Sequence, residues 1–278
     1  MEKLKVGLIQ MKTHEDAEKN LHRASEMVGR AAKSGAEIVC LPELFGTRYF
    51  PASRNSTVKP ERIPGPSSDM LSAAARENRV VLVGGSLFES AGGRRYNTSL
   101  IFDAKGRLIG KYRKVHVPQD PYFYEKNYFS PGNRYTVVKT EKCRIGVLIC
   151  FDQWYSEAAR INRLMGADIL FYPTAIGTVS GIEQTEGSWK DAWTAVQRGH
   201  AIANSLIVAC ANRTGREGDM NFWGGSFVCD QFGNFIARGG RGEEALIAEC
   251  DPGLGRNIEK GWGFLRNRMP STYGRLVR

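Results

Sequence analysis

An internal repeat constrains the fold of this chain more than any other feature of its sequence. Residues 35–42 read GAEIVCLP and residues 166–173 read GADILFYP, with the glycine, alanine, acid, aliphatic residues and closing proline in the same places. A second pair, SLIFDAKGRLIGK at 99–111 and SFVCDQFGNFIAR at 226–238, aligns the aspartate and the glycine of a turn. The period is much longer than the roughly 20–50 residues of solenoid repeats, so the repeat predicts two similar halves.

Each half has the same predicted order of strand, helix, strand, helix, strand and hairpin. In the first half these elements are predicted at 4–11, 15–33, 36–41, 67–79, 80–88 and 97–114. In the second half they are predicted at 143–150, 153–165, 167–172, 187–204, 205–211 and 226–240. Two such units pack sheet against sheet with helices outside, which predicts an α/β fold, a four-layer α-β-β-α sandwich of two pseudo-symmetric halves. No linker composition separates the halves, so we expect a single domain over 1–278, with a C-terminal tail from about 255.

Charge and cysteine usage exclude several classes of protein. The net charge is +10, but no block of five or more lysines and arginines exists, so we expect no nucleic-acid partner. The N-terminus lacks the apolar core of a signal peptide, and no apolar run is long enough to span a membrane, which predicts a cytoplasmic protein without a membrane partner. The six cysteines form no CxxC pair and the four histidines have no metal-ligand spacing, so neither a disulfide framework nor a metal site is expected.

Three polar residues stand where predicted strands end, the place at which ligands gather in α/β sheets. Glu43 follows the strand EIVCLP, Lys114 closes a hairpin strand, and Cys150 ends the strand RIGVLIC. Taken singly, Glu43 could cap a turn, Lys114 could be a solvated base and Cys150 could be a core thiol. Together they supply a base, a cation and a nucleophile, which is a complete hydrolytic set.

Four segments resemble the signature blocks of the nitrilase superfamily. LPELF (41–45), GKYRKVHVP (110–118) and LICFDQWYSEAAR (148–160) resemble its three main blocks, and YEKNYFSPG (124–132) is similar to the block that carries its second glutamate. The resemblance extends to the C-terminal GWGFLRNRMPSTYGRL and so covers essentially the whole chain.

The resemblance implies a role for each of these residues. The thiolate of Cys150 would attack the carbonyl carbon and form a thioester-type intermediate, and Glu43 would act as general base and then activate water. Lys114 and the backbone N–H of Phe151 would stabilise the oxyanion. Glu125 would orient Lys114 and the substrate; the alternative is a surface acid. The resemblance implies a small-molecule amide or ureido substrate and no cofactor.

The residues around the cysteine are similar to the N-carbamoylputrescine amidase branch of the superfamily. This implies cleavage of a ureido group to putrescine, ammonia and carbon dioxide. Phe151 stands where that branch commonly has tryptophan. Trp154 and Tyr124 are candidate substrate-binding residues. A cationic amine also needs a local acid, for which Glu183 and Glu186 are candidates, with Asp191 as a third; all three could instead be ordinary solvated residues.

Other functions remain open at this level. An anionic substrate such as N-carbamoyl-β-alanine would suit a ureidopropionase-like enzyme and would require a pocket arginine, for which Arg213 is the nearest candidate, although a structural role also fits it. An aliphatic or ω-amidase, a nitrilase, and a non-catalytic binding relative are further alternatives. The resemblance also implies a homo-oligomer, a dimer or larger, with the C-terminal tail either at the interface or over its own subunit.

Overall fold

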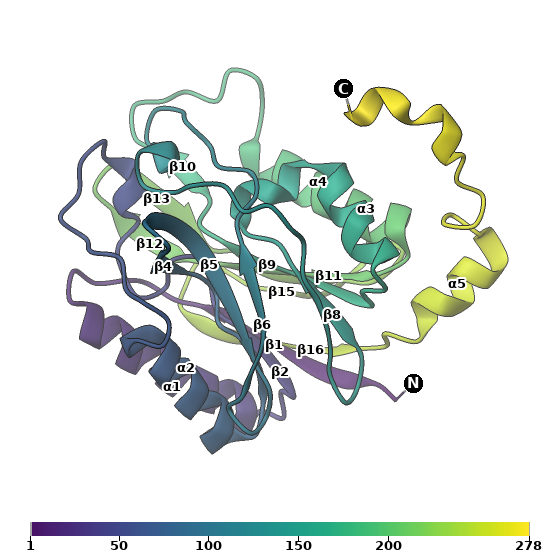
Figure 1. The fold of residues 1–278 in the computed structure, drawn as a ribbon, viewed down its shortest axis with the longest axis horizontal. Coiled ribbons are helices and arrows are strands. Elements are labelled where there is room, and N and C mark those ends of the chain that lie inside the picture. The colour runs from purple at the N-terminus through teal and green to yellow at the C-terminus, as the bar shows by residue number, and fades with distance from the viewer. Residues whose placement is uncertain (1, 278) are drawn as a thin grey trace.

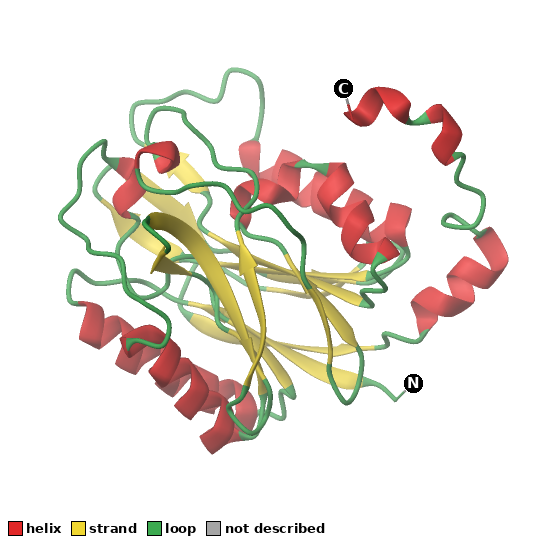
Figure 2. Ribbon diagram, in the orientation of Figure 1, coloured by secondary structure: helices red, strands yellow, loops and turns green. Residues whose placement is uncertain are grey.

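Two β-sheets pack face to face, and a pair of helices covers the outer face of each (Figures 1 and 2). The computed structural model describes residues 2–277. Helices α1 (Ala17–Lys33) and α2 (Pro66–Asn78) lie on one sheet, and α3 (Ser156–Leu164) and α4 (Trp189–Asn204) lie on the other. The predicted four-layer α-β-β-α sandwich is therefore confirmed.

The two sheets have matching strand orders. The first sheet runs β16-β1-β2-β3-β5-β4, with β6 also paired to β5. Read from the corresponding edge, the second sheet runs β7-β8-β9-β11-β14-β15. The strands of the first sheet are β1 (Leu4–Gln10), β2 (Ile38–Cys40), β3 (Val81–Val83), β4 (Leu87–Ala91), β5 (Arg94–Phe102), β6 (Leu108–Arg113) and β16 (Glu244–Cys250). Those of the second are β7 (Val137–Lys139), β8 (Arg144–Val147), β9 (Ile169–Thr174), β11 (Ile207–Asn212), β14 (Phe227–Cys229) and β15 (Phe235–Arg238).

The halves exchange one strand each. Strand β7 follows the first hairpin along the chain but pairs antiparallel with β8 of the second sheet. Strand β16 follows the second hairpin and pairs antiparallel with β1 of the first sheet, over seven residue pairs. Each sheet is thus completed by a strand from the other half, which the sequence repeat did not predict because it ends at the hairpins.

The two hairpin turns confirm the repeat at atomic detail. In each turn the carboxylate of the aspartate, Asp103 or Asp230, accepts hydrogen bonds from the backbone N–H groups two and four residues later. The glycine of each turn has a positive φ, +76° at Gly106 and +74° at Gly233, a conformation that glycine adopts without steric cost.

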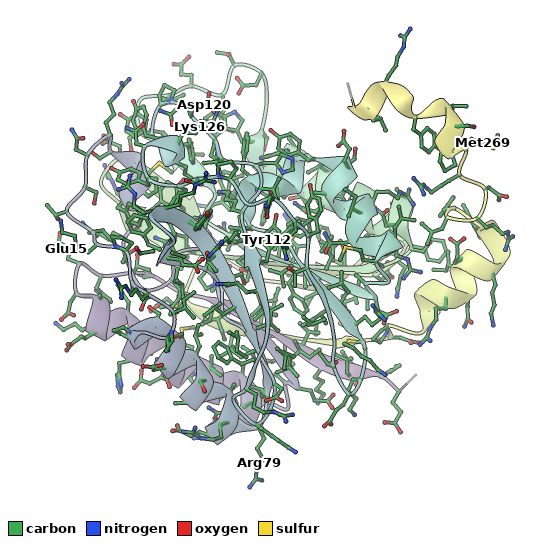
Figure 3. All side chains as sticks on the ribbon, viewed as in Figure 1. Glu15, Arg79, Tyr112, Asp120, Lys126 and Met269 are labelled. Atoms are coloured by element: carbon green, nitrogen blue, oxygen red, sulfur yellow. The ribbon has the colours of Figure 1, made fainter. Side chains whose placement is uncertain are left out.

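The main core lies between the sheets and is built from both halves. It includes Val6 and Val83 from the first sheet and Val147 and Val208 from the second, all essentially inaccessible to solvent. Tyr112 lies at the centre of the molecule in the same core (Figure 3). All six cysteines are buried and free.

The predicted strand at 80–88 is interrupted, and the interruption matters for the site. Strand β3 ends at Val83 and β4 begins at Leu87, because the chain turns at Gly85, where φ is +55°. The turn brings the hydroxyl of Ser86 to the backbone N–H of Leu44, at 2.9 Å. A Cβ at Gly85 would lie 2.1 Å from the carbonyl oxygen of Pro42, so only glycine fits this close approach.

Two further features were not predicted as separate elements. A small sheet of β10 (Gly177–Val179), β13 (Met220–Trp223) and β12 (Thr214–Glu217) forms at one end of the sandwich. Helix α5 (Leu254–Trp262) and the segment after it lead away from the sandwich and curve back past α3 (Figure 1). None of the helices in the described part of the chain is long and apolar enough to cross a membrane.

Candidate active site

The three predicted residues meet at one edge of the sandwich. Glu43 follows β2, Lys114 follows β6 directly, and Cys150 is the first residue of the short 3-10 helix η3 (Cys150–Trp154) that follows β8. The backbone N–H of Glu43 donates to the carbonyl of Thr174 at the end of β9, so this edge is where the two sheets come together. Glu43 and Lys114 are at most 1% exposed and Cys150 is 8% exposed, so all three are withdrawn from bulk water.

A buried ion network joins Lys114 to two glutamates. Its ammonium nitrogen lies 2.9 Å from Oε1 of Glu43 and 2.8 and 2.7 Å from the two carboxylate oxygens of Glu125. The amide of Asn97 donates to Oε1 of Glu43 at 2.8 Å, and the hydroxyl of Tyr49 donates to Oε1 of Glu125 at 2.7 Å. The structure therefore brings Glu125, predicted only from the fourth sequence block, into direct contact with Lys114.

One oxygen of this network has no partner. Oε2 of Glu43 is buried and accepts no hydrogen bond from any residue in the described range 2–277. Buried polar atoms without a partner are rare in folded proteins because each costs the lost solvation of the group. A free carboxylate oxygen in a buried site can accept a proton or a hydrogen bond from a bound molecule.

Cys150 lies on a strained turn that its neighbours hold in place. Its φ is +41°, an unfavourable conformation for a residue with a side chain. The carboxylate of Asp152 accepts from the backbone N–H of Ile149 and of His116, both at 2.9 Å, and from the hydroxyl of Tyr112 at 2.7 Å. The His116 ring also hydrogen-bonds Asp152, at 2.7 Å. These bonds tie the turn to the strand end that carries Lys114.

The charges in the site set the resting protonation of its groups. Burial raises the pKa of the Cys150 thiol well above its ordinary value, and the negative charge of Glu43 raises it further, while Lys114 offsets only part of this. Burial opposes the charge of Lys114, but Glu125 and Glu43 outweigh it and hold the pKa of the ammonium above its usual range. Burial raises the pKa of Glu125 to about 7 against the opposing charge of Lys114. Burial and Glu43 therefore favour the thiol form of Cys150, and the two glutamates favour the charged form of Lys114.

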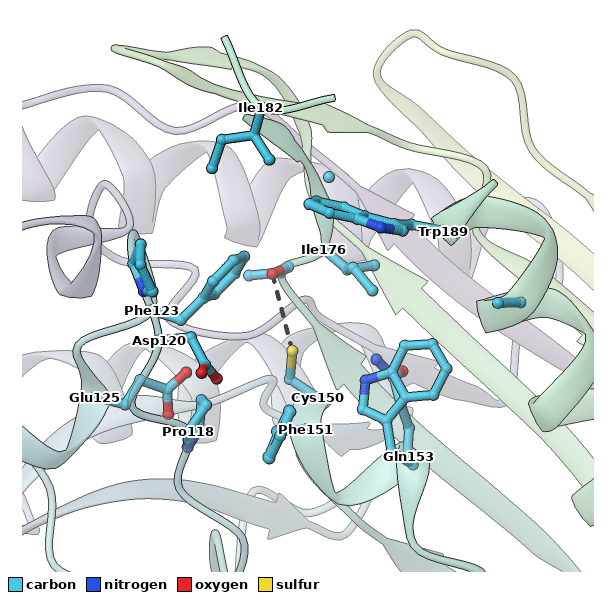
Figure 4. Close-up of a pocket in the computed structure, with 15 residues that line it drawn as sticks. Pro118, Asp120, Phe123, Glu125, Cys150, Phe151, Gln153, Ile176, Ile182 and Trp189 are labelled. Carbon is cyan, nitrogen blue, oxygen red and sulfur yellow. Dashed lines mark hydrogen bonds between the residues drawn. The ribbon is translucent and has the colours of Figure 1, made fainter. Parts of the chain in front are cut away.

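Cys150 opens onto a cavity of about 460 Å³ (Figure 4). Its sulfur lies 3.8 Å from the carbonyl oxygen of Ala175, which Figure 4 marks with a dashed line. Glu125 also lines the cavity. Most of the remaining wall is apolar and aromatic: Phe123, Phe151, Trp154, Ile176, Ile182 and Trp189.

Of the predicted substrate-binding residues, Trp154 lines the cavity and Tyr124 does not. Trp154 is 37% exposed and lies at the mouth. The ring of Tyr124 instead packs under the guanidinium of Arg54, whose central carbon is 4.7 Å from the ring centroid.

The two predicted acids, Glu183 and Glu186, do not line the cavity in the structure. Both are exposed, and the carboxylate of Glu186 accepts a hydrogen bond from the indole N–H of Trp189. Their segment turns the apolar side chains of Ile182 and Trp189 toward the cavity. The acid that lies at the mouth is Asp120, which the sequence did not single out.

Arg213, considered as a pocket arginine, lies outside the cavity lining and is fully buried. One of its terminal nitrogens donates to the carbonyls of Glu43, Leu44 and Thr47, at 2.9, 2.7 and 3.1 Å. The other donates to the carboxylate of Glu217 at 2.8 Å. The arginine therefore holds the backbone that carries Glu43, which supports the structural role.

Fold and site together are those of a carbon–nitrogen hydrolase. The family model described as carbon-nitrogen hydrolase matches residues 5–260. The chain thus belongs to the carbon–nitrogen hydrolase family, the nitrilase superfamily, and its activity is that of an amidase of this family.

Two curated relatives and one solved structure are similar over nearly their whole lengths. A citrullinase of Francisella tularensis is 36% identical, with 100% of this chain and 99% of the relative covered. An N-carbamoylputrescine amidase of Solanum lycopersicum is 36% identical, with 98% and 94% covered. A carbon–nitrogen hydrolase of Helicobacter pylori G27 superposes with a TM-score of 0.93 at 35% identity, with 100% and 99% covered. The predicted resemblance to the superfamily and its N-carbamoylputrescine amidase-like branch is confirmed.

Proposed function

We propose that the protein hydrolyses N-carbamoylputrescine to putrescine, ammonia and carbon dioxide, with Cys150 as nucleophile and Glu43 as general base. The observation that carries the mechanism is the unpartnered Oε2 of Glu43 in a buried network beside the thiol. Oε1 of Glu43 is held by hydrogen bonds from Lys114 and Asn97, which leaves Oε2 of the same carboxylate free to exchange a proton.

In the first step the Cys150 thiol gives its proton to Glu43 as the sulfur attacks the ureido carbon. Because burial holds the pKa of this thiol high, a free thiolate is scarce and proton transfer must accompany attack. The new C–S bond forms a tetrahedral intermediate. Its collapse breaks the bond to the terminal nitrogen, Glu43 returns the proton, and ammonia leaves, so that a thiocarbamate remains on the cysteine.

In the second step water attacks the thiocarbamate carbon while Glu43 takes a proton from that water. The C–S bond breaks, the proton returns to the sulfur, and the carbamate of putrescine leaves. This carbamate releases carbon dioxide to give putrescine. Glu43 and Cys150 end the cycle in the protonation states in which they began.

The oxyanion of both tetrahedral intermediates is stabilised by Lys114 and by the N–H of Phe151. Lys114 is held as a charged ammonium by two carboxylates, which positions a positive charge without access to water. Phe151 is the second residue of η3, and the first N–H groups of a helix have no intrahelical acceptor. Loss of one such donor costs on the order of 10²–10³ in rate in comparable enzymes. Glu125, with both oxygens on Lys114, orients the ammonium.

The shape and charge of the cavity favour the putrescine compound. Its apolar walls suit a chain of methylene groups, and none of the lining residues in the described part of the chain is lysine or arginine. An anionic substrate such as N-carbamoyl-β-alanine would leave its carboxylate unpaired there. The names of the two curated relatives denote compounds with a terminal ureido group, citrulline and N-carbamoylputrescine, which supports a ureido substrate.

The C-terminal tail supports the further proposal that the protein is a homo-oligomer. Trp262, Met269 and Leu276 are each at least 60% exposed, an unusual display of large apolar side chains on one short segment. Light scattering during size-exclusion chromatography of the full chain measures this directly. A single species at the 30.9 kDa of one chain would refute the proposal.

Ammonia release from four substrates tests the proposed reaction. The substrates are N-carbamoylputrescine, citrulline, N-carbamoyl-β-alanine and a simple aliphatic amide, each with the wild type and with Cys150→Ala. We expect the highest kcat/KM with N-carbamoylputrescine and no turnover in Cys150→Ala. Cys143→Ala, which removes another buried thiol outside the cavity, is the matched control and should retain turnover. Preference for another substrate would retain the mechanism and reject the substrate, whereas turnover by Cys150→Ala would reject the mechanism.

A further inference from the structure

We propose that Asp120 binds the distal ammonium group of the substrate and thereby sets specificity for a cationic amine. This inference rests on the proposed function for the reaction at the ureido end. It concerns the distal end of the substrate, for which the sequence suggested Glu183 and Glu186, neither of which lines the cavity.

The cavity has a buried floor and an exposed mouth, and each contains one carboxylate. At the floor lie Cys150 and Glu125, which are 8% and 1% exposed. At the mouth lie Asp120, Trp154 and Ile182, all exposed. A substrate with its ureido carbon at the sulfur must direct its other end toward the mouth, where solvent also lowers the cost of a charged group.

Asp120 is the carboxylate that remains available. Both oxygens of Glu125 are already bound to Lys114, and one also accepts from Tyr49. Across residues 2–277 the side chain of Asp120 takes part in no ion pair and no hydrogen bond. Figure 4 shows its carboxylate turned into the cavity, across from Trp189. The two indole rings of Trp154 and Trp189 also suit a cation, because ammonium groups are attracted to the faces of aromatic rings.

Backbone hydrogen bonds close the loop that carries Asp120. Its backbone N–H and carbonyl pair with those of Phe123, at 3.3 and 2.8 Å, and Pro121 lies between them. Tyr122 completes the tight turn with a φ of +66°. The preceding Gln119 turns away, and its amide binds the backbone N–H of Lys126 and the side chain of Asn127. Because the backbone of this turn is already closed, only the short side chain of Asp120 has to be ordered when it binds a cation.

A pair of isosteric substrates isolates the contribution of the substrate's ammonium charge from that of all other contacts in the site. N-pentylurea has the shape of N-carbamoylputrescine but carries a methyl group in place of the ammonium. The variants are Asp120→Asn, the conservative Asp120→Glu, and Glu77→Gln. Glu77 is an exposed acid in the last turn of α2, so its variant controls for the loss of one negative charge far from the cavity.

We expect Asp120→Asn to lower kcat/KM for N-carbamoylputrescine about tenfold through KM, the scale of a hydrogen bond to a charged group at a partly exposed site. The value of kcat at saturation and the value of kcat/KM for N-pentylurea should change less than twofold. Asp120→Glu should retain most of the preference for the charged substrate, and Glu77→Gln all of it. Because the Asp120 side chain has no partner in the described structure, thermal unfolding of Asp120→Asn should match the wild type.

The outcomes distinguish this inference from the proposed function. If the wild type hydrolyses N-pentylurea with the same kcat/KM as N-carbamoylputrescine, the proposed reaction stands and the ammonium subsite is refuted. Equal losses on both substrates in Asp120→Asn would also refute it, because the effect would then not depend on the charge. If the wild type hydrolyses neither ureido compound, the proposed function fails and this inference fails with it.

Discussion

Replacement of Glu43 by glutamine should separate catalysis from stability in the buried network. The substitution preserves shape but removes the base that takes the thiol proton. General-base catalysis contributes roughly 10²–10⁴ in rate. The high pKa of the Cys150 thiol leaves little thiolate to react without that base. We therefore expect kcat for ammonia release to fall by about 10²–10⁴ in Glu43→Gln.

The same substitution should change the unfolding free energy little, because the buried network holds more negative than positive charge. One buried ammonium, Lys114, faces two buried carboxylates, Glu43 and Glu125, so the ionised network carries one excess negative charge. Glutamine at position 43 removes that excess and can still accept from Lys114 and Asn97. Its amide nitrogen adds one unpaired donor, at a cost of about 1–3 kcal/mol. The loss of carboxylate repulsion opposes this cost, so we expect the unfolding free energy to change by less than about 2 kcal/mol.

Replacement of Lys114 should instead lower the unfolding free energy strongly, and it provides the comparison for Glu43→Gln. Lys114→Met leaves two buried carboxylates without a cation, which costs about 3–5 kcal/mol. At about 2–4 °C per kcal/mol for a chain of this size, the midpoint of thermal unfolding should fall by roughly 6–20 °C. Glu89→Gln is the matched control, because Glu89 is also buried and paired with Arg113 and Lys111 but lies outside the cavity. It should lower stability and leave kcat unchanged.

Thermal unfolding and the ammonia assay, applied to the same preparations, test this reasoning. A loss of more than about 3 kcal/mol in Glu43→Gln would show that the carboxylate is needed for stability and that the charge count is wrong. Retention of more than a tenth of the wild-type kcat would show that Glu43 is not the base.

Three further variants test the groups around the network. Tyr49→Phe removes a donor to the ionised form of Glu125, so the pKa of that carboxyl should rise and move the acid limb of the kcat–pH profile upward; an unchanged profile contradicts this. Glu125→Gln should flatten the pH dependence of stability. In the folded protein the pKa of the Glu125 carboxyl is raised from 4.5 to about 7. The stability that this group contributes is therefore present in full below its pKa in the unfolded state and is lost as the pH rises through 7. Urea unfolding between pH 4 and 8 measures that slope, and an unaltered slope excludes the shift. Arg213→Met should cost about 3–5 kcal/mol, because it leaves Glu217 buried without its cation. Arg216→Met, which replaces an exposed arginine in the adjoining strand β12, should lower the free energy of unfolding in urea far less, and equal losses would argue against the structural role of Arg213.

Local sequence determined the elements and the outline of the site. Alternating and helical hydrophobic patterns, turn glycines such as Gly106 and Gly233, and the aspartates that precede them depend on consecutive residues, so their effect can be predicted without the fold. Because the repeat encoded two equivalent units, it predicted two stacked sheets. The ends of strands then placed Glu43, Lys114 and Cys150 at one edge, since parallel strands share a carboxyl edge.

Tertiary structure alone decided the partners of those residues. Asn97 and Tyr49 carry no sequence signal, yet they fix Glu43 and Glu125 through contacts over 54 and 76 positions of the chain. Arg213 reaches the carbonyl of Glu43 over 170 positions. Such contacts depend on how the complete sheets pack against each other. That packing is set by the side chains of the whole core and not by any one segment.

The same reason explains two of the differences between the sequence-based predictions and the structure. The exchange of β7 and β16 between the sheets is decided by which sheet edge remains open once both halves are folded. The acid at the cavity mouth is Asp120 because the loop after Lys114 folds over the cavity, while the segment with Glu183 turns its apolar side chains inward. Hydrophobic periodicity sets what each segment becomes, but the direction in which a loop side chain points is set by the surfaces that the loop meets.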